Sequence, residues 1–170
     1  MKNTETLEVT TPTDREIVLT RVFDAPRRLV FDAWTKPELL KRWLGAFGGW
    51  SLVVCEIDLR VGGAYRYVWR DPEGAEMGMR GVYREVVPPE RLVATESFDE
   101  PWYPGEAVDT IALREDGGKT TVTTTVLYQS REARDIALKS GMEQGVAAGY
   151  DKLAELLASG MAQGDSESGA

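Results

Sequence analysis

The chain has 170 residues, of which 42% are hydrophobic and 28% are charged. This composition is typical of a single folded domain and excludes a disordered or fibrous chain. Because 20 basic residues stand against 28 acidic ones, we expect neither nucleic acid nor an anionic membrane as a partner. The absence of histidine and the single cysteine, Cys55, exclude an internal disulfide, catalysis by imidazole and most zinc sites. We therefore expect no metal and no cofactor.

Small and polar residues dominate both ends of the chain. Residues 1–13 are rich in threonine and residues 160–170 in glycine and serine, which predicts flexible tails on either side of a single domain, residues 14–159. No stretch approaches the roughly 18 apolar residues of a membrane span, and the first residues lack the apolar region of a signal peptide. The expected location is the cytoplasm.

One strand and two short helices open the domain. Hydrophobic residues alternate with others over residues 15–23, which predicts a strand. Apolar residues then recur at helical spacing in two segments, residues 29–34 and 39–44. We predict a short helix for each of these segments.

In the middle of the chain, hydrophobic residues recur with a period of two. Over residues 50–128, turn signals rich in glycine and proline separate alternating stretches, which predicts six strands in an antiparallel meander. Residues 131–159 carry a helical apolar stripe, with a break expected at Ser140 and Gly141. The predicted fold class is α+β: a seven-stranded curved antiparallel sheet wrapped around a long C-terminal helix, with the two short helices between the first two strands.

Aromatic and methionine side chains follow one face of two neighbouring predicted strands. They either fill a core or line an apolar pocket in which tyrosine hydroxyls are the polar groups. On the last helix, Gly145 and Gly149 lie in the stripe that faces the sheet, although glycine in a helix costs up to about 1 kcal/mol relative to alanine. Either the helix backbone approaches the sheet closely there, or the glycines leave space for a bound molecule.

Carboxylates are the remaining candidates for polar ligand contacts or acid–base chemistry. Four of them lie in predicted strands: Glu56, Asp58, Glu96 and Asp109. Glu56 and Asp58 alternate with apolar residues and are expected to face solvent or to pair with arginines such as Arg60. Glu96 instead lies on an apolar face, where a carboxylate needs a partner or becomes protonated. Glu96 is therefore the expected polar contact of a ligand.

Several short motifs, taken in their order along residues 15–159, resemble one known group of proteins. They include Phe23-Asp24-Ala25-Pro26, Pro37-Glu38-Leu39-Leu40, Asp58-Leu59-Arg60-Val61-Gly62-Gly63 and Pro88-Pro89-Glu90-Arg91-Leu92. The chain resembles the START/Bet v 1-like (SRPBCC) superfamily and, within it, the activator of heat-shock-protein-ninety ATPase homologue-like family. The resemblance implies the helix-grip fold and a cavity between sheet and long helix that takes hydrophobic ligands.

The chain departs from similar sequences at one position of the last helix. These often carry an aromatic residue after the glycine that matches Gly145, where this chain has Val146 and, one turn later, Tyr150. If that position lines the cavity, the pocket is larger here and Tyr150 offers a hydroxyl group.

We predict a binding module for a small hydrophobic molecule such as a lipid, and we assign no catalytic residue. The expected ligand-binding residues are Tyr65, Tyr67, Trp69, Met79, Tyr83, Glu96, Phe98, Met142 and Tyr150. Two alternatives stay open: a stress-response module that interacts with a chaperone and stimulates its ATPase, which only the resemblance implies, and a cyclase- or hydrolase-type enzyme in which Glu96 and a tyrosine act as acid and base. The chain is expected to be a monomer or a homodimer.

Overall fold

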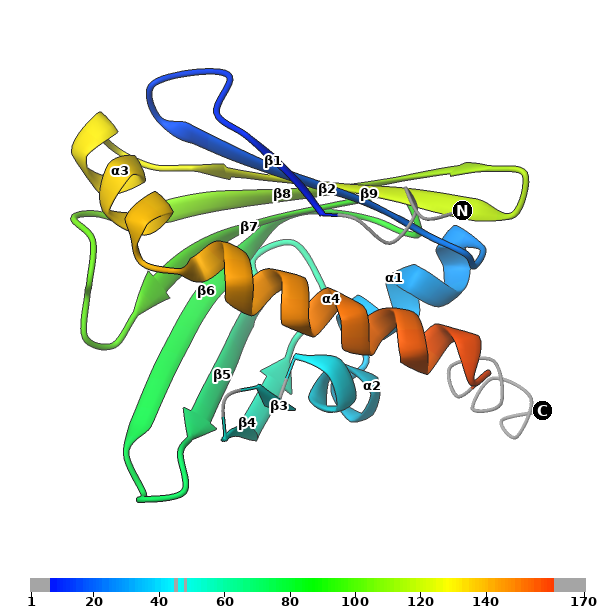
Figure 1. Cartoon of the computed structure of the whole chain (residues 1–170), viewed down its shortest axis with the longest axis horizontal. Coiled ribbons are helices and arrows are strands. Elements are labelled where there is room, and N and C mark those ends of the chain that lie inside the picture. Colours follow the sequence, from blue (N-terminus) through cyan, green and yellow to red (C-terminus); the bar gives the residue numbers. More distant parts are fainter. Residues whose placement is uncertain (1–6, 45, 48, 161–170) are drawn as a thin grey trace.

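The computed structural model describes residues 7–44, 46–47 and 49–160, and the strands within these ranges form one antiparallel sheet (Figure 1). The strands are β1 (Glu8–Thr10), β2 (Glu16–Phe23), β3 (Ala46–Phe47), β4 (Trp50–Ile57), β5 (Ala64–Arg70), β6 (Glu76–Val87), β7 (Arg91–Phe98), β8 (Ala107–Asp116) and β9 (Lys119–Leu127). Their spatial order is β1-β2-β9-β8-β7-β6-β5-β4-β3. The six strands from β4 to β9 form the predicted meander, and β2 pairs with β9.

Four helices within the described ranges complete the fold: α1 (Arg27–Thr35), α2 (Pro37–Trp43), α3 (Arg131–Lys139) and α4 (Met142–Ala158). α4 crosses the concave side of the sheet, α1 and α2 lie towards its C-terminal end, and α3 lies at the opposite end (Figure 1). This arrangement confirms the predicted α+β helix-grip fold. No helix in the described part of the chain is long and apolar enough to cross a membrane.

The sheet contains two short strands beyond the seven that the sequence predicts. β1 pairs with β2, with Val9 opposite Leu19, and β3 pairs with β4. The prediction of a flexible tail is therefore wrong for Glu8–Thr10, because backbone pairing with β2 orders a segment whose composition alone favours disorder. Residues 1–6 and 161–170, which make up most of the remaining predicted tails, lie outside the described residues.

The predicted break in the C-terminal helical segment separates α3 from α4. Ser130 begins α3, and its side chain accepts a hydrogen bond from the Ala133 amide. Gly141 has φ of 89°, a left-handed conformation that residues with a side chain rarely adopt. The chain therefore leaves α3 at this glycine and begins α4 in a new direction.

α4 is anchored to the sheet by apolar packing and by one partly buried ion pair. Leu153 is fully buried beneath the helix. The Arg21 guanidinium, on the concave side of β2, contacts the Asp151 carboxylate at 2.7 Å. Trp34 of α1 and Trp43 of α2 are buried, with ring centroids 4.7 Å apart, and both rings contact Tyr150. These two tryptophans complete the core, as we expect of large aromatic side chains.

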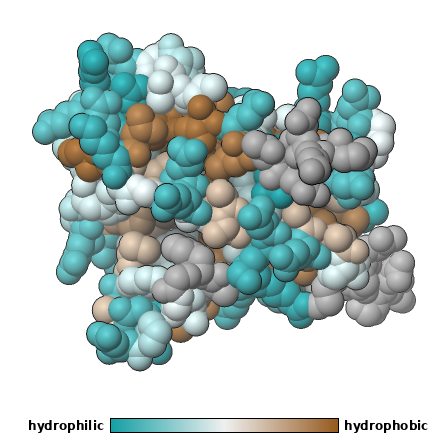
Figure 2. Space-filling model, viewed as in Figure 1, coloured by the Kyte–Doolittle hydropathy of each residue, from teal (hydrophilic) through white to brown (hydrophobic). Residues whose placement is uncertain are grey.

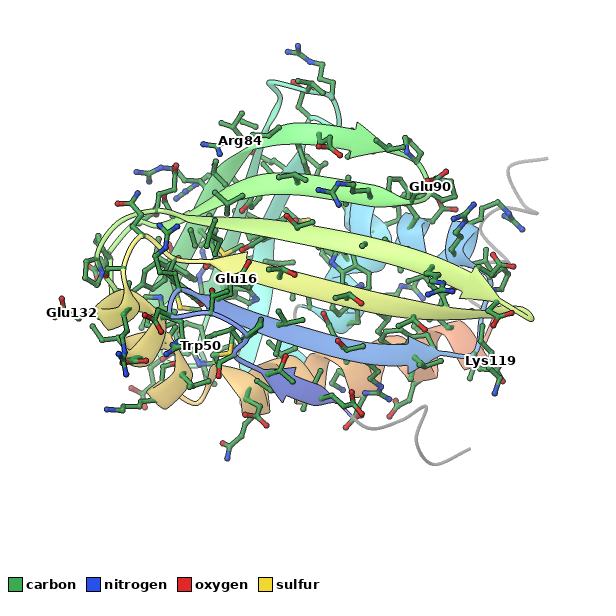
Figure 3. All side chains as sticks on the ribbon, turned by 90° about the horizontal axis from the view of Figure 1, so that it is seen from above. Glu16, Trp50, Arg84, Glu90, Lys119 and Glu132 are labelled. Carbon is green, nitrogen blue, oxygen red and sulfur yellow. The ribbon has the colours of Figure 1, made fainter. Side chains whose placement is uncertain are left out.

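The convex face of the sheet carries charged side chains, and Figure 3 shows it from above with Arg84 among them. Arg66 and Arg80 both bind the carboxylate of Asp99, at 2.6 and 2.7 Å. These pairs are largely exposed, so they contribute little to the free energy of unfolding. The tyrosines that alternate with the arginines of β5 consequently face the concave side.

Candidate functional site

A cavity of about 220 Å³ lies between the concave face of the sheet and α4. Aromatic and aliphatic side chains make up most of its wall. The residues that line it are Leu19, Trp34, Leu40, Trp43, Leu44, Tyr65, Tyr67, Met79, Tyr83, Leu92, Ala94, Glu96, Asp109, Ile111, Thr124, Val126, Met142, Gly145, Val146, Gly149 and Tyr150. They come from the sheet, from α1 and α2 with the residue that follows, and from α4.

The sheet side of the cavity depends on a glycine that lets one tyrosine cross a neighbouring strand. Gly81 of β6 is opposite Tyr65 of β5, and the Tyr65 hydroxyl donates a 2.6 Å hydrogen bond to the carbonyl oxygen of Thr95 on β7. A Cβ atom at Gly81 would lie 2.5 Å from Cε2 of Tyr65. Only glycine therefore allows the Tyr65 ring to lie across β6 in this position.

The two glycines of α4 both border the cavity. A Cβ atom at Gly149 would lie 3.5 Å from the carbonyl oxygen of Trp43 and 3.8 Å from its ring. The close neighbour of Gly149 is therefore α2, not the sheet. Gly145 and Gly149 together present backbone in place of side chains to the cavity, which agrees with the interpretation that they leave space.

Two carboxyl groups lie in the lining. Asp109 of β8 is opposite Ala94 of β7, and Glu96 is opposite Ala107, so Glu96 and Asp109 are diagonal neighbours on the same face of the sheet. The Tyr103 hydroxyl donates a 2.7 Å hydrogen bond to Oε2 of Glu96. No lysine or arginine of the described ranges lines the cavity.

The Asp109 carboxyl group lies in a poorly solvated environment. Burial, together with the neighbouring Glu96 carboxyl, raises the pKa of Asp109 well above its ordinary value of 3.8. Its Oδ1 atom is buried and has no hydrogen-bond partner within the described part of the protein. A buried acceptor without a partner is costly, so this oxygen marks a place where a ligand donor would be favourable.

The tyrosine hydroxyls around the cavity are neutral hydrogen-bonding groups. Burial raises the pKa of Tyr83 and of Tyr150 to about 12, and burial likewise raises the pKa of Tyr65. The Tyr150 and Thr124 hydroxyls are 3.2 Å apart and share a hydrogen bond. These groups can therefore orient a ligand by hydrogen bonding without adding charge.

Seven of the nine predicted binding residues lie in the cavity wall: Tyr65, Tyr67, Met79, Tyr83, Glu96, Met142 and Tyr150. Trp69 and Phe98 lie outside it. The Trp69 indole donates a hydrogen bond to the Leu44 carbonyl, while Phe98 packs against Trp102 and Tyr103 in the loop between β7 and β8. Both residues lie near the ends of their strands, where their rings pack against connecting segments.

Sequence reasoning gave no specific role to several residues of the wall. Asp109 shares the alternation of Ala107, Ile111 and Leu113, the same pattern that singles out Glu96. This pattern alone indicates that the Asp109 side chain lies on an apolar face of the sheet. Thr124 follows the alternation of β9 in the same way. The contribution of Trp34 and Trp43 depends on where α1 and α2 pack, which periodicity does not specify.

Two of the four carboxylates considered from the sequence lie away from the cavity. Glu56 and Asp58 are exposed, and the Asp58 carboxylate pairs with Arg60 at 3.0 Å. The prediction that both face solvent is confirmed.

The curved sheet, the long helix across it and the cavity between them define a helix-grip protein of the START/Bet v 1-like class. The family model of activator of Hsp90 ATPase homolog 1-like proteins matches residues 24–158. The chain belongs to this family.

Solved structures from several bacteria share the fold. A protein of Rhodobacter sphaeroides is 32% identical, with a TM-score of 0.85 over 90% of this chain and 98% of that one. A protein of Nitrosomonas europaea is 29% identical, with a TM-score of 0.78 over 89% of this chain and 99% of that one. No curated protein matches the chain.

Proposed function

We propose that this protein binds a small hydrophobic molecule in the cavity between the sheet and α4. The observation that carries the proposal is an apolar cavity of about 220 Å³ between the sheet and α4. An engineered cavity of about 150 Å³ in another protein is large enough to bind benzene. The present cavity therefore suits a molecule at least as large as one aromatic ring.

The composition of the wall supports a specific ligand. Small-molecule sites combine an apolar lining with a few well-placed polar groups. Here the rings of Trp34, Trp43 and Tyr67 supply apolar surface, and Glu96 and Asp109 supply polar contacts. Methionine adds adaptability, because the Met79 and Met142 side chains adjust to ligand shape.

Native mass spectrometry of the protein purified from its own host tests the proposal. A stoichiometric apolar molecule that leaves on denaturation would support binding in the cavity. A cavity-filling variant, Val146→Phe, should then be isolated without that molecule. Retention of the molecule by this variant would place its binding site elsewhere.

Interaction with a chaperone is a second candidate function, favoured by the family to which the chain belongs. Trp102, Ile136 and Leu138 are each 36% exposed, and α3 and the β7–β8 loop lie at the same end of the molecule (Figure 1). On the face that carries α4, hydrophobic residues gather over β1 and α3 (Figure 2). The test is the ATPase rate of the host's chaperone with and without this protein; an unchanged rate would contradict this candidate.

A further inference from the structure

We propose that the ligand of the cavity is a small apolar amine whose ammonium group lies between Glu96 and Asp109. This inference rests on the proposed function and names the class of ligand. It follows from the charge of the wall, from the unpartnered acceptor and from the nearby aromatic rings.

The charge of the wall favours a cation. Among the described residues, Glu96 and Asp109 are the two carboxyl groups of the lining, and no lysine or arginine accompanies them. Arg21, on the concave side of β2, lies outside the lining; its Nη1 atom is bound to Asp151 at 2.7 Å, and its Nε atom is buried without a hydrogen-bond partner in the described residues. A carboxylate ligand such as a fatty acid would therefore bring a third acid beside these two without any cation of the wall to neutralise it.

The available hydrogen-bonding atoms favour a donor over an acceptor. Oδ1 of Asp109 is buried without a partner in the described residues, and Oε2 of Glu96 accepts a hydrogen bond from the Tyr103 hydroxyl. An ammonium group has three donors and no acceptor, so it can donate to both side chains at once. A hydroxyl group has one donor, and it would place its lone pairs near the remaining carboxyl oxygen.

Aromatic rings near the two carboxyl groups complete the site. Tyr65, Tyr67 and Tyr83 line the same cavity as the two carboxyl groups. The rings of Tyr65 and Tyr67 are 4.9 Å apart, and those of Tyr65 and Tyr83 are 5.6 Å apart. Ring faces attract cations, and the rest of the wall buries the apolar body of the ligand.

Three naphthalene derivatives that differ only in their polar group test this inference: 2-naphthylmethylamine, 2-naphthylmethanol and 2-naphthoic acid. Their affinities for the full chain are measured by isothermal titration calorimetry at pH 7. We expect the amine to bind at least about tenfold more tightly than the alcohol, because its hydrogen bonds are charge-assisted, and the acid to bind most weakly.

Substitutions in the cavity wall test which side chains cause the preference for the amine. Glu96→Gln and Asp109→Asn should each remove most of the preference for the amine while changing the affinity of the alcohol by less than about threefold. Glu155→Gln, which neutralises an exposed carboxylate of α4, is the matched control and should keep the preference. Urea unfolding of each variant verifies that it is folded.

The outcomes separate this inference from the proposed function. If the three compounds bind equally well and Val146→Phe abolishes their binding, the cavity takes apolar molecules but the preference for an amine is refuted. If the preference survives both carboxyl substitutions, the placement of the ammonium group is refuted. Failure of all three compounds to bind would contradict both the inference and the proposed function.

Discussion

The hydroxyl group of Tyr103 donates a hydrogen bond to the carboxylate of Glu96 over 2.7 Å. Tyr103 belongs to the loop between β7 and β8, and its ring is buried against Tyr128 at a centroid distance of 5.1 Å. The contact therefore joins a loop at the α3 end of the molecule to a side chain of the cavity wall. Through this bond, the position of the loop and that of the cavity-lining carboxylate depend on one another.

Tyr103→Phe removes this hydrogen bond and keeps the ring. We expect the free energy of unfolding to fall by about 1.5 kcal/mol, because one oxygen of Glu96 loses its donor. Urea unfolding monitored by circular dichroism measures the change. Trp102→Phe, in the same loop but 36% exposed, is the control and should alter stability by less than about 0.5 kcal/mol. Equal effects of both substitutions would show that the loop, and not the bond, determines the loss.

Asp109→Asn should stabilise the protein at neutral pH. The folded-state pKa of Asp109 is raised above its ordinary value of 3.8, so its contribution to stability is fully present below that value and is lost as pH rises towards the folded-state pKa. Asparagine does not ionise, and we expect the variant to gain at least about 1 kcal/mol over the wild type at pH 7. The gain should shrink at pH 4. Urea unfolding at both pH values measures it, and a gain that does not depend on pH would contradict the raised pKa.

Cys55 should react slowly with alkylating reagents. Burial raises the pKa of its thiol from 9.0 to about 11, which lowers the thiolate fraction at pH 8 by about a hundredfold. The rate of modification by iodoacetamide, followed by mass spectrometry, measures this. In concentrated urea the thiol should regain ordinary reactivity, and a folded-state rate equal to the unfolded one would contradict the prediction.

Val146→Phe places an aromatic ring in the cavity. Val146 is a partly buried wall residue of α4, so we expect the affinity for any cavity ligand to fall at least about tenfold, since the larger side chain occupies the same volume. Calorimetry with 2-naphthylmethylamine measures the loss. Ala148→Phe, on the exposed side of the same helix, adds the same ring without entering the cavity and should leave binding unchanged.

Gly81→Ala should disturb the sheet where Tyr65 crosses it. The added methyl group would overlap the Thr95 carbonyl oxygen and the Tyr65 ring, and overpacking of this kind costs about 1–3 kcal/mol. Gly74→Ala provides a contrast, because a Cβ atom there has nothing within 4 Å and only the positive φ of 93° opposes it. The free energies of unfolding of the two variants, and the near-ultraviolet spectrum that reports the Tyr65 environment, distinguish packing from backbone strain.

The sequence predicts the fold well because its main signals are local. Alternation over the long strands, glycine and proline in the turns and the helical stripe after residue 131 each specify an element without knowledge of the others. β1 and β3 could not be predicted in this way, because strands of three and two residues are too short to show an alternation of hydrophobic and polar residues. They form by pairing with β2 and β4.

The alternation of residues along a strand predicts which side chains of the candidate site lie on the concave face of the sheet. The alternation that places Tyr65, Tyr67 and Glu96 on the concave face applies equally to Asp109. The two bulges, between Leu52 and Val54 in β4 and between Tyr83 and Glu85 in β6, shift the register between neighbouring strands. Such shifts, and the packing of α1 and α2 against α4, depend on contacts between distant segments and cannot be read from periodicity.

The pairing of β2 with β9 also affects the order in which the protein is completed during synthesis. Glu16 is opposite Leu127, so β2 is synthesised well before β9, the strand with which it pairs. α4, which covers the cavity, follows later still. The strands of the concave face are therefore synthesised before α4. Until α4 docks, the nascent chain exposes the aromatic side chains of that face.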